Sequence, residues 1–129
     1  MTKNNNQKGH HCTEEMLETI TNRLEKDPEN ISLLLEKSSC LRHLKREEEA
    51  VEVHDQLISL DPENAEFYFM KGLVLIEFDR NEQAIGCFNK ALELRPNFRD
   101  ALFNKGLALQ RLGKNAEAKS LMREAFNIN

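Results

Sequence analysis

The chain has 129 residues and a formal net charge of −4, with 40% apolar and 31% charged residues, which is typical of a globular protein. The acidic balance argues against nucleic-acid binding, which depends on clustered Lys and Arg side chains. No apolar run approaches the roughly 18 residues of a membrane span, and no basic segment followed by an apolar one indicates a secretory leader. We therefore expect a cytoplasmic protein without a nucleic-acid or membrane role.

The first twelve residues carry almost no apolar side chains, and we expect residues 1–12 to form a disordered tail. Within it, His10, His11 and Cys12 offer three metal-binding groups in a row. Adjacent residues on a tail lack the spaced geometry of a structural zinc site, so we expect no metal. Adventitious metal binding stays open, as does any other role for this segment.

Three cysteines are widely spaced along the chain: Cys12, Cys40 and Cys87. An odd number at such spacing predicts reduced thiols in an intracellular protein rather than a disulfide framework.

A first helix is predicted over residues 13–26. Thr13 is a suitable N-cap, and two acidic residues follow it in the first turn. Met16, Ile20 and Leu24 then share one face, and the helix ends before Pro28. We expect this helix to cap the array of repeats that follows.

The three prolines of the chain, Pro28, Pro62 and Pro96, are spaced 34 residues apart. The sequence Asp-Pro-Glu-Asn at 27–30 recurs unchanged at 61–64, whereas the third copy drifts to Arg-Pro-Asn-Phe at 95–98. A fixed period of this length indicates a helical solenoid.

Each repeat contains two apolar patterns of helical period separated by a short turn. Small residues fall into register on both helices of each pair: Ser38, Gly72 and Gly106 on the first, and Ala50, Ala84 and Ala118 on the second. Small side chains allow two helices to approach closely where they cross, because a larger residue there would overpack the contact.

These columns resemble the tetratricopeptide repeat family. The second repeat carries the motif most fully: Tyr68, Lys71, Gly72, Leu75, Ala84, Phe88, Ala91 and Pro96. The third repeat supplies Leu102, Lys105, Gly106, Leu109, Ala118, Met122 and Ala125, and the first supplies Leu34, Lys37, Ser38, Leu41, Ala50, His54 and Pro62. Lys replaces the motif Leu in all three, and the motif Trp is absent.

The resemblance implies an all-α fold, a right-handed superhelix of antiparallel helix pairs with the N-terminal capping helix at one end. We expect a single domain over 13–129. Its parts are the capping helix 13–26 and three repeats: 31–64, 65–98 and 99–129.

The family binds partners in a concave groove lined by the first helix of each repeat. The resemblance assigns the following residues to the groove: Leu35, Ser39 and Arg42 from the first repeat; Glu66, Phe69, Leu73 and Ile76 from the second; Asp100, Phe103, Leu107 and Gln110 from the third. Ser32 holds the remaining first-repeat position. The apolar members indicate a site for a protein or peptide partner, anchored on Phe69 and Phe103 and framed by charged residues such as Arg111. The same side chains could instead pack on neighbouring helices.

Co-chaperone members of the family hold a peptide carboxylate with Lys, Asn and Arg side chains. The matching positions here are Leu35, Ser39, Met70, Asp100 and Asn104. None is basic, so we expect no binding of a chaperone C-terminal tail.

No cluster of nucleophile, base and charge stabiliser indicates an enzyme, and no cofactor is expected. Cys40 and His43 lie three residues apart, but Cys40 aligns with Val74 and Ala108, which favours a buried packing role. We expect a non-catalytic interaction module or scaffold. The alternative is a homodimer formed through the last helix, which carries Leu121, Met122, Phe126 and Ile128 with no helix after it.

Overall fold

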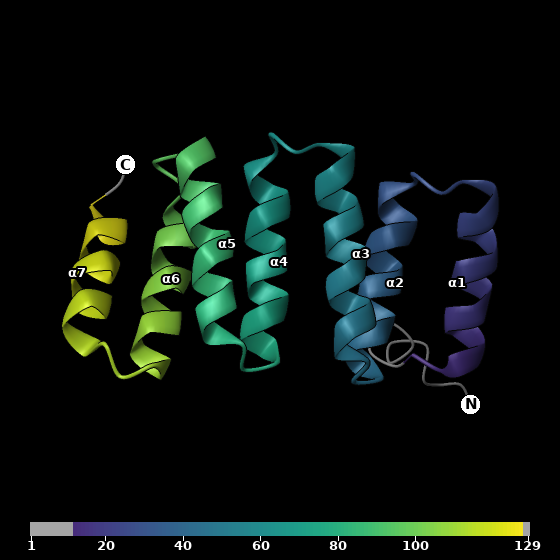
Figure 1. The fold of residues 1–129 in the computed structure, drawn as a ribbon, viewed down its shortest axis with the longest axis horizontal. Coiled ribbons are helices and arrows are strands. Elements are labelled where there is room, and N and C mark those ends of the chain that lie inside the picture. Colours follow the sequence, from purple (N-terminus) through teal and green to yellow (C-terminus); the bar gives the residue numbers. More distant parts are fainter. Residues whose placement is uncertain (1–11, 128–129) are drawn as a thin grey trace, which may run out of the picture. The chain divides into compact units, whose positions relative to one another are not determined.

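A computed structural model describes residues 12–127, which form helices and turns without a strand (Figure 1). The helices in chain order are α1 (Glu14–Lys26), α2 (Ile31–His43), α3 (Glu47–Leu60), α4 (Ala65–Glu77), α5 (Asn81–Leu94), α6 (Arg99–Arg111) and α7 (Asn115–Phe126). The expected tail falls almost entirely outside the described residues, as do His10, His11 and Ile128.

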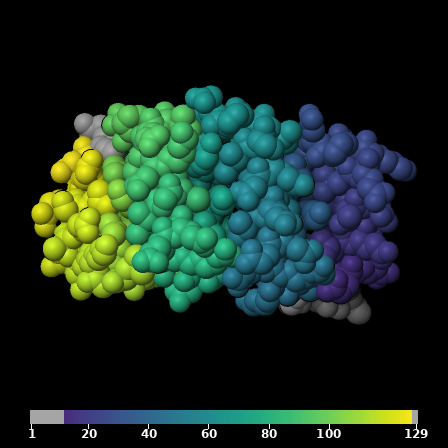
Figure 2. Space-filling view, viewed as in Figure 1, coloured from purple at the N-terminus to yellow at the C-terminus, as the bar shows by residue number. Residues whose placement is uncertain are grey.

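The chain forms two compact units, one ending at Leu60 and the other beginning at Asp61. In the first unit α2 packs against both α1 and α3. In the second, α4, α5, α6 and α7 pack in sequence, and α4 also contacts α6. Figure 2 shows side chains filling the spaces between the ribbons within each unit on the face in view. The predicted helix pairs are therefore confirmed.

The prolines begin short turns that repeat along the chain. The amide N–H of Asn30 donates to the Asp27 carbonyl at 3.2 Å, and that of Asn64 donates to the Asp61 carbonyl at 3.1 Å. The two Asn side chains then cap the following helices, with their Oδ1 atoms accepting backbone hydrogen bonds at 3.0 Å and 2.9 Å. Phe98 occupies the position equivalent to Asn30 and Asn64, and its side chain does not cap α6. The change of sequence in the third copy is therefore accompanied by the loss of this cap.

The turn inside each repeat is also conserved from one repeat to the next within the chain. Lys45, Asp79 and Gly113 all have positive φ, at 62°, 61° and 84°. The residue after each donates its amide N–H back to the carbonyl of Leu41, Leu75 or Leu109, at 2.8, 2.8 and 2.9 Å. These are Schellman motifs, which satisfy carbonyl groups at the helix end. Their recurrence fixes the turn between the helices of each pair.

Glycines allow the helices of the second unit to pack closely. A Cβ atom on Gly72 would lie 2.8 Å from Cζ and 2.9 Å from Cδ1 of Phe88. A Cβ atom on Gly106 would lie 2.9 Å from Cγ of Met122. All three distances are shorter than real Cβ contacts, so the small-residue column predicted from the sequence does mark the positions where the helices approach each other.

The cysteines differ from the sequence-based expectation. Cys12 forms a disulfide with Cys40, and Cys87 is not part of a disulfide. The prediction that all three are reduced thiols was wrong. The fold brings the segment before α1 against α2, with the two Cα atoms 5.1 Å apart, within the range that a disulfide spans. Cys40 is buried, as its alignment with Val74 and Ala108 predicted.

Candidate functional site

Four apolar side chains from α4 and α6 occupy equivalent positions in two successive repeats of the second unit. Phe69 and Leu73 come from α4, and Phe103 and Leu107 come from α6. Members of each pair are four residues apart, so they lie on one face of their helix. We call this set the α4/α6 surface, and its two helices contact each other.

Two of these side chains are unusually exposed for their type. Leu73 is 38% exposed and Phe103 is 40% exposed, while Phe69 and Leu107 are half-buried. Exposed apolar side chains that occur singly need no explanation, but a group supported by half-buried neighbours is typical of a contact surface. Leu73 and Phe103 are therefore the members with most surface available to a partner.

Phe69 supports the surface more than it contributes to it. Its ring lies 4.9 Å from the ring of Phe98 and 5.9 Å from the ring of Phe88, between centroids. Rings at such distances stabilise each other through edge and offset contacts. The Arg95 guanidinium lies 4.0 Å from the centroid of the Phe98 ring. Phe98 stands where the earlier repeats have a capping Asn, and it packs against the ring of Phe69 instead of capping the helix.

Ile76, which the sequence assigned to the groove, is only 8% exposed and does not offer a contact surface. Its backbone carbonyl has a different role, because it accepts a hydrogen bond from Nη1 of Arg111 at 3.3 Å. This bond joins the C-terminal ends of α4 and α6. Arg111 therefore lies at that end of the α4/α6 surface, and its role as a framing residue stays a prediction.

The opposite ends of the two helices carry acidic side chains. Glu66 and Asp100 lie in the first turns of α4 and α6 and are both exposed. Oε2 of Glu66 accepts a hydrogen bond from Nη2 of Arg95 at 3.4 Å, which offsets part of that acidic character. Gln110 is exposed near the other end of α6.

The remaining positions predicted for the groove lie on α2 in the first unit. Leu35 and Arg42 are half-buried there, and Ser39 is exposed. One apolar side chain is thus accompanied by two polar ones, so the apolar character is concentrated in the second unit.

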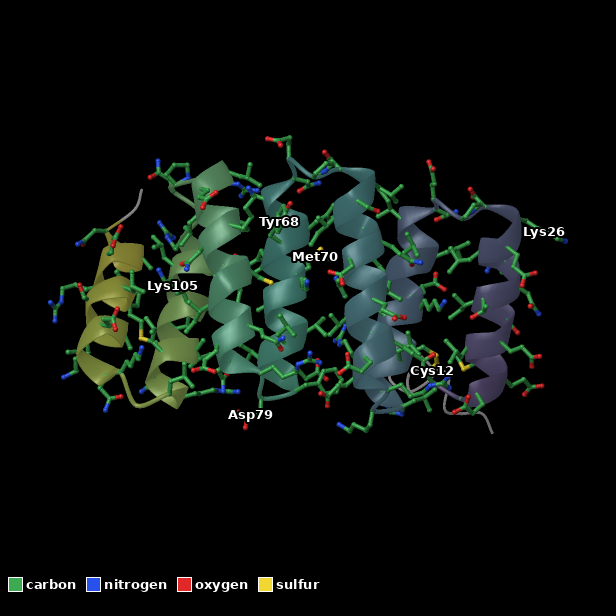
Figure 3. All side chains as sticks on the ribbon, viewed as in Figure 1. Cys12, Lys26, Tyr68, Met70, Asp79 and Lys105 are labelled. Atoms are coloured by element: carbon green, nitrogen blue, oxygen red, sulfur yellow. A yellow bond between two sulfur atoms is a disulfide. The ribbon has the colours of Figure 1, made fainter. Side chains whose placement is uncertain are left out.

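The positions that bind a carboxylate in co-chaperones have no cationic side chain. Met70 is half-buried on α4, and Asn104 donates its Nδ2 amide to the Asp100 backbone carbonyl at 2.8 Å. Figure 3 labels Met70 on α4 and Lys105 on α6, together with Tyr68 toward the start of α4 and Asp79 just beyond its end. The Tyr68 hydroxyl donates to the Pro62 carbonyl at 3.1 Å, so this motif side chain secures the proline turn.

The last helix presents one large apolar side chain to solvent. Phe126 is 79% exposed, whereas Leu121 and Met122 are half-buried. Met122 packs against Gly106 on α6, so much of its side chain serves the helix pair. Of the three residues predicted for self-association, Phe126 is the one most available.

Residues 12–127 contain no group of three His, Cys, Asp or Glu side chains that could hold a metal ion. In the same part of the chain no helix is long and apolar enough to cross a membrane. The Cys40 sulfur is in the disulfide and offers no thiol to His43, three residues away.

Sequence profiles of the tetratricopeptide repeat match residues 31–64 and 100–129, and a related repeat profile matches residues 72–113. The chain belongs to the tetratricopeptide repeat family. Its members are built from the helix pairs and small-residue contacts described above, so the predicted family and its all-α fold class are confirmed. No curated protein is significantly similar to the chain.

Solved structures of the protein MamA have the same tetratricopeptide repeat fold. One MamA crystal structure superposes with a TM-score of 0.73 at 23% identity, covering 88% of this chain and 67% of the MamA chain. MamA AMB-1 gives 0.74 at 22% identity, covering 90% and 69%. MamA from Desulfovibrio magneticus RS-1 gives 0.75 at 18% identity, covering 88% and 64%. At these identities the likeness concerns the fold alone.

Proposed function

We propose that this tetratricopeptide repeat protein is a non-catalytic interaction module that binds an apolar segment of a partner protein on the α4/α6 surface. The observation that carries the proposal is the exposure of Leu73 and Phe103, at 38% and 40%, on two helices that contact each other. Family membership supports the same class of function, because these repeats serve mainly as protein-binding scaffolds.

The favoured ligand is an amphipathic helix or an extended peptide with spaced apolar anchors. Such segments bind surfaces that present apolar side chains at matching intervals. The acidic Glu66 and Asp100 at one end of the surface, with Arg111 at the other, favour a ligand with a basic residue toward the former. A terminal carboxylate is a poor fit, because Asp100 would repel it. By repeat equivalence, Leu35, Ser39 and Arg42 are the corresponding positions of the first unit.

A displayed library of amphipathic helices tests the proposal. Peptides selected on the wild-type chain should bind in a fluorescence anisotropy titration and lose at least about tenfold in affinity to Leu73→Glu/Phe103→Glu, since a buried charge without a partner is costly. Phe126→Glu is the matched control, because it also replaces an exposed apolar residue by Glu but lies on α7. Equal affinity for the wild type and the double variant would overturn the proposal. Circular dichroism checks that each variant keeps its helical content.

A second candidate function is self-association through α7, favoured by the 79% exposure of Phe126. A large aromatic side chain this exposed is a common anchor in protein interfaces. Sedimentation equilibrium at micromolar concentration should then show a dimer that Phe126→Glu converts to a monomer. The Leu73→Glu/Phe103→Glu variant should remain dimeric, which distinguishes the two surfaces.

We also propose that the protein acts in the cytoplasm without binding nucleic acid, membranes or a cofactor. The net charge of −4, with acidic and basic residues interleaved, supports the absence of nucleic-acid binding. Fluorescence microscopy of a tagged chain tests the location.

A further inference from the structure

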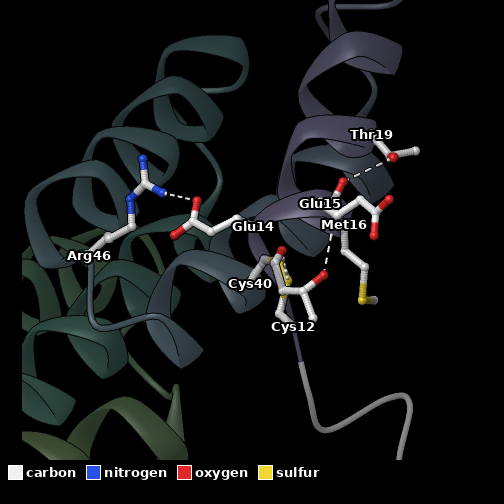
Figure 4. Close-up of a disulfide and its surroundings, with 8 residues drawn as sticks. Cys12, Glu14, Glu15, Met16, Thr19, Cys40 and Arg46 are labelled. Atoms are coloured by element: carbon white, nitrogen blue, oxygen red, sulfur yellow. Dashed lines mark hydrogen bonds and ion pairs between the residues drawn. A yellow bond between two sulfur atoms is a disulfide. The ribbon is translucent and has the colours of Figure 1, made fainter.

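The Cys12–Cys40 disulfide attaches the beginning of α1 to α2 (Figure 4). Cys12 directly precedes Thr13, whose Oγ1 accepts a hydrogen bond from the Met16 amide at 3.1 Å and caps α1. Cys12 is half-buried, whereas Cys40 is only 3% exposed. The bond therefore joins an accessible sulfur at a helix start to a sulfur inside the first unit.

The repeat period shows what this attachment replaces. Cys12 is equivalent to Arg46 and Arg80, which follow the Schellman turns of the first two full repeats. In those repeats the turn connects the second helix covalently to the first helix of the same pair. In the described part of the chain, no helix precedes α1, so α1 corresponds to a second helix without its first. The disulfide supplies a covalent link at the N-terminal end of α1, where a full repeat has the turn from its first helix.

Other contacts of α1 in the first unit are modest. Its buried residues are Leu17, Ile20 and Leu24, a single stripe. Beyond these, Nη1 of Arg46 lies 2.8 Å from Oε1 of Glu14, an exposed ion pair drawn in Figure 4. Exposed ion pairs contribute little to stability and are screened by salt. The disulfide adds a covalent bond to these contacts at the start of α1.

The core around Cys40 can accommodate this residue both in the disulfide and as a reduced thiol. Its equivalents in the other repeats are Val74 and Ala108, which are also buried. A reduced Cys is a small apolar side chain that fills such a position well. Breaking the bond should therefore leave the α2–α3 packing intact and act on the attachment of α1.

We propose that Cys12 and Cys40 form a reversible thiol–disulfide site that controls how firmly α1 is held on α2. The oxidant is a low-molecular-weight disulfide of the glutathione class. The Cys12 thiolate attacks one sulfur of that disulfide and releases the first glutathione thiol. The Cys40 thiolate then attacks the Cys12 sulfur of the mixed disulfide, which breaks its bond to glutathione and releases the second thiol. The two protein thiols supply the two electrons that reduce glutathione disulfide.

The difference in exposure sets the order of these steps. An external thiolate or disulfide must reach the sulfur that it attacks. Cys12 is the accessible partner and Cys40 is enclosed by the first unit. In the reducing direction, glutathione thiolate attacks Cys12 and the Cys40 thiolate leaves, to be protonated in place. A second glutathione thiolate then frees Cys12 and yields glutathione disulfide.

Hydrogen exchange on the full chain tests whether the disulfide holds α1 on α2. The bond closes a loop across a sequence separation of 28 residues, and the loss of chain entropy on closing such a loop corresponds to a factor on the order of 100 in local opening. Amides of α1 should therefore exchange on the order of 100-fold faster after reduction with dithiothreitol than after oxidation with glutathione disulfide. Amides of α5 and α6 should not change.

Thiol counting by alkylation and mass spectrometry provides the redox readout. Protein treated with glutathione disulfide and then unfolded for alkylation should present one thiol, that of Cys87, and a cross-linked peptide pair containing Cys12 and Cys40. Three thiols should appear when reduced protein is unfolded and alkylated in the same way, because unfolding exposes Cys40. Persistence of three thiols in excess glutathione disulfide would overturn the proposal, as would equal exchange of α1 in both states.

Three variants make the test specific. Cys40→Ala installs the residue that the third repeat has at this position, and it should keep α1 in fast exchange under oxidising conditions. Cys12→Ser should do the same, so it serves if Cys40→Ala fails to fold. Cys87→Ser is the matched control and should retain the redox response. Slow exchange of α1 in oxidised Cys12→Ser would show that the bond does not hold the helix.

Discussion

Oγ of Ser38 and Nε2 of His54 lie 2.7 Å apart and form a hydrogen bond in the buried contact between α2 and α3. The equivalent pairs in the second unit are Gly72 with Phe88, and Gly106 with Met122. Where the first helix has Gly, the second supplies a bulky apolar side chain that would collide with a Cβ atom. Where the first helix has Ser, the second supplies an imidazole that pairs with the hydroxyl. The repeats thus use two different solutions to the same close helix contact.

This pairing predicts strong coupling between positions 38 and 54. His54→Phe alone should lower the free energy of unfolding by about 1–3 kcal/mol, because the Ser38 hydroxyl loses its partner and the larger ring meets a Cβ atom. Adding Ser38→Gly should recover most of that loss, since the pair then matches Gly72 and Phe88. Urea denaturation of both single variants and the double variant measures the coupling. Additive effects of the two changes would contradict the prediction.

Gly72→Ala should destabilise the chain by about 1–3 kcal/mol, because the added methyl group meets the ring of Phe88. Gly86 provides the control, since it lies within α5 and a Cβ atom there would meet nothing within 4 Å. Gly86→Ala should instead stabilise by about 0.5–1 kcal/mol through the higher helix propensity of Ala. Thermal unfolding followed by circular dichroism should give shifts of opposite sign, and a loss of stability in both variants would count against the packing argument.

Much of the fold could be predicted because several independent sets of equivalent residues repeat with the same 34-residue period. The small residues, the prolines and the apolar stripes all gave the same register, and the structure confirms the helix pairs that follow from it. The single domain expected over 13–129 stays a prediction. The period also located α1, since a helix ending at Pro28 occupies the place of a second helix in a repeat.

The parts that were missed depend on contacts specific to one repeat. Nothing in the spacing of Cys12 and Cys40 showed that the segment before α1 lies against α2, so the disulfide was not predicted. The burial of Ile76 likewise depends on the rotation of α4 about its own axis. A repeat pattern defines that rotation only to within a fraction of a helical turn. The position of Phe98 carried a usable signal, because an aromatic residue in place of the Asn cap indicates a packing role.

Lys45→Gly should stabilise the chain. Lys45 has a φ of 62°, in the left-handed region, where Gly113 lies in the third repeat at 84°. A residue with a Cβ atom pays a steric penalty of roughly 1–2 kcal/mol there, part of which is offset by the greater freedom of Gly in the unfolded chain. We therefore expect a net gain of about 0.5–1 kcal/mol in urea denaturation. The converse change, Gly113→Ala, should destabilise, and the same sign for both variants would refute the reasoning.

Arg46 connects two acidic side chains in the first unit. Its Nε lies 2.7 Å from Oε1 of Glu49 and its Nη2 lies 3.1 Å from Oε2, so the guanidinium and carboxylate pair through two hydrogen bonds. These hydrogen bonds lower the pKa of Glu49 below its ordinary value of 4.5, with a further contribution from the charge of Arg46. The same partners raise the pKa of Arg46, led by the hydrogen bond to Glu49.

The lowered pKa of Glu49 predicts an acid-dependent contribution to stability. Since the folded state holds the Glu49 carboxylate in its charged form more strongly than the unfolded state does, the pair stabilises the fold above pH 4.5. That contribution is lost as the pH falls below 4.5 through the lowered pKa. Glu49→Gln should therefore reduce stability at pH 7 but bring the variant and the wild type closer together in acid. Urea denaturation at a series of pH values measures this difference, which should shrink in high salt because the pair is exposed. Glu52→Gln, also on α3, controls for removing one exposed negative charge, and an identical pH profile for the two variants would contradict the role of Arg46.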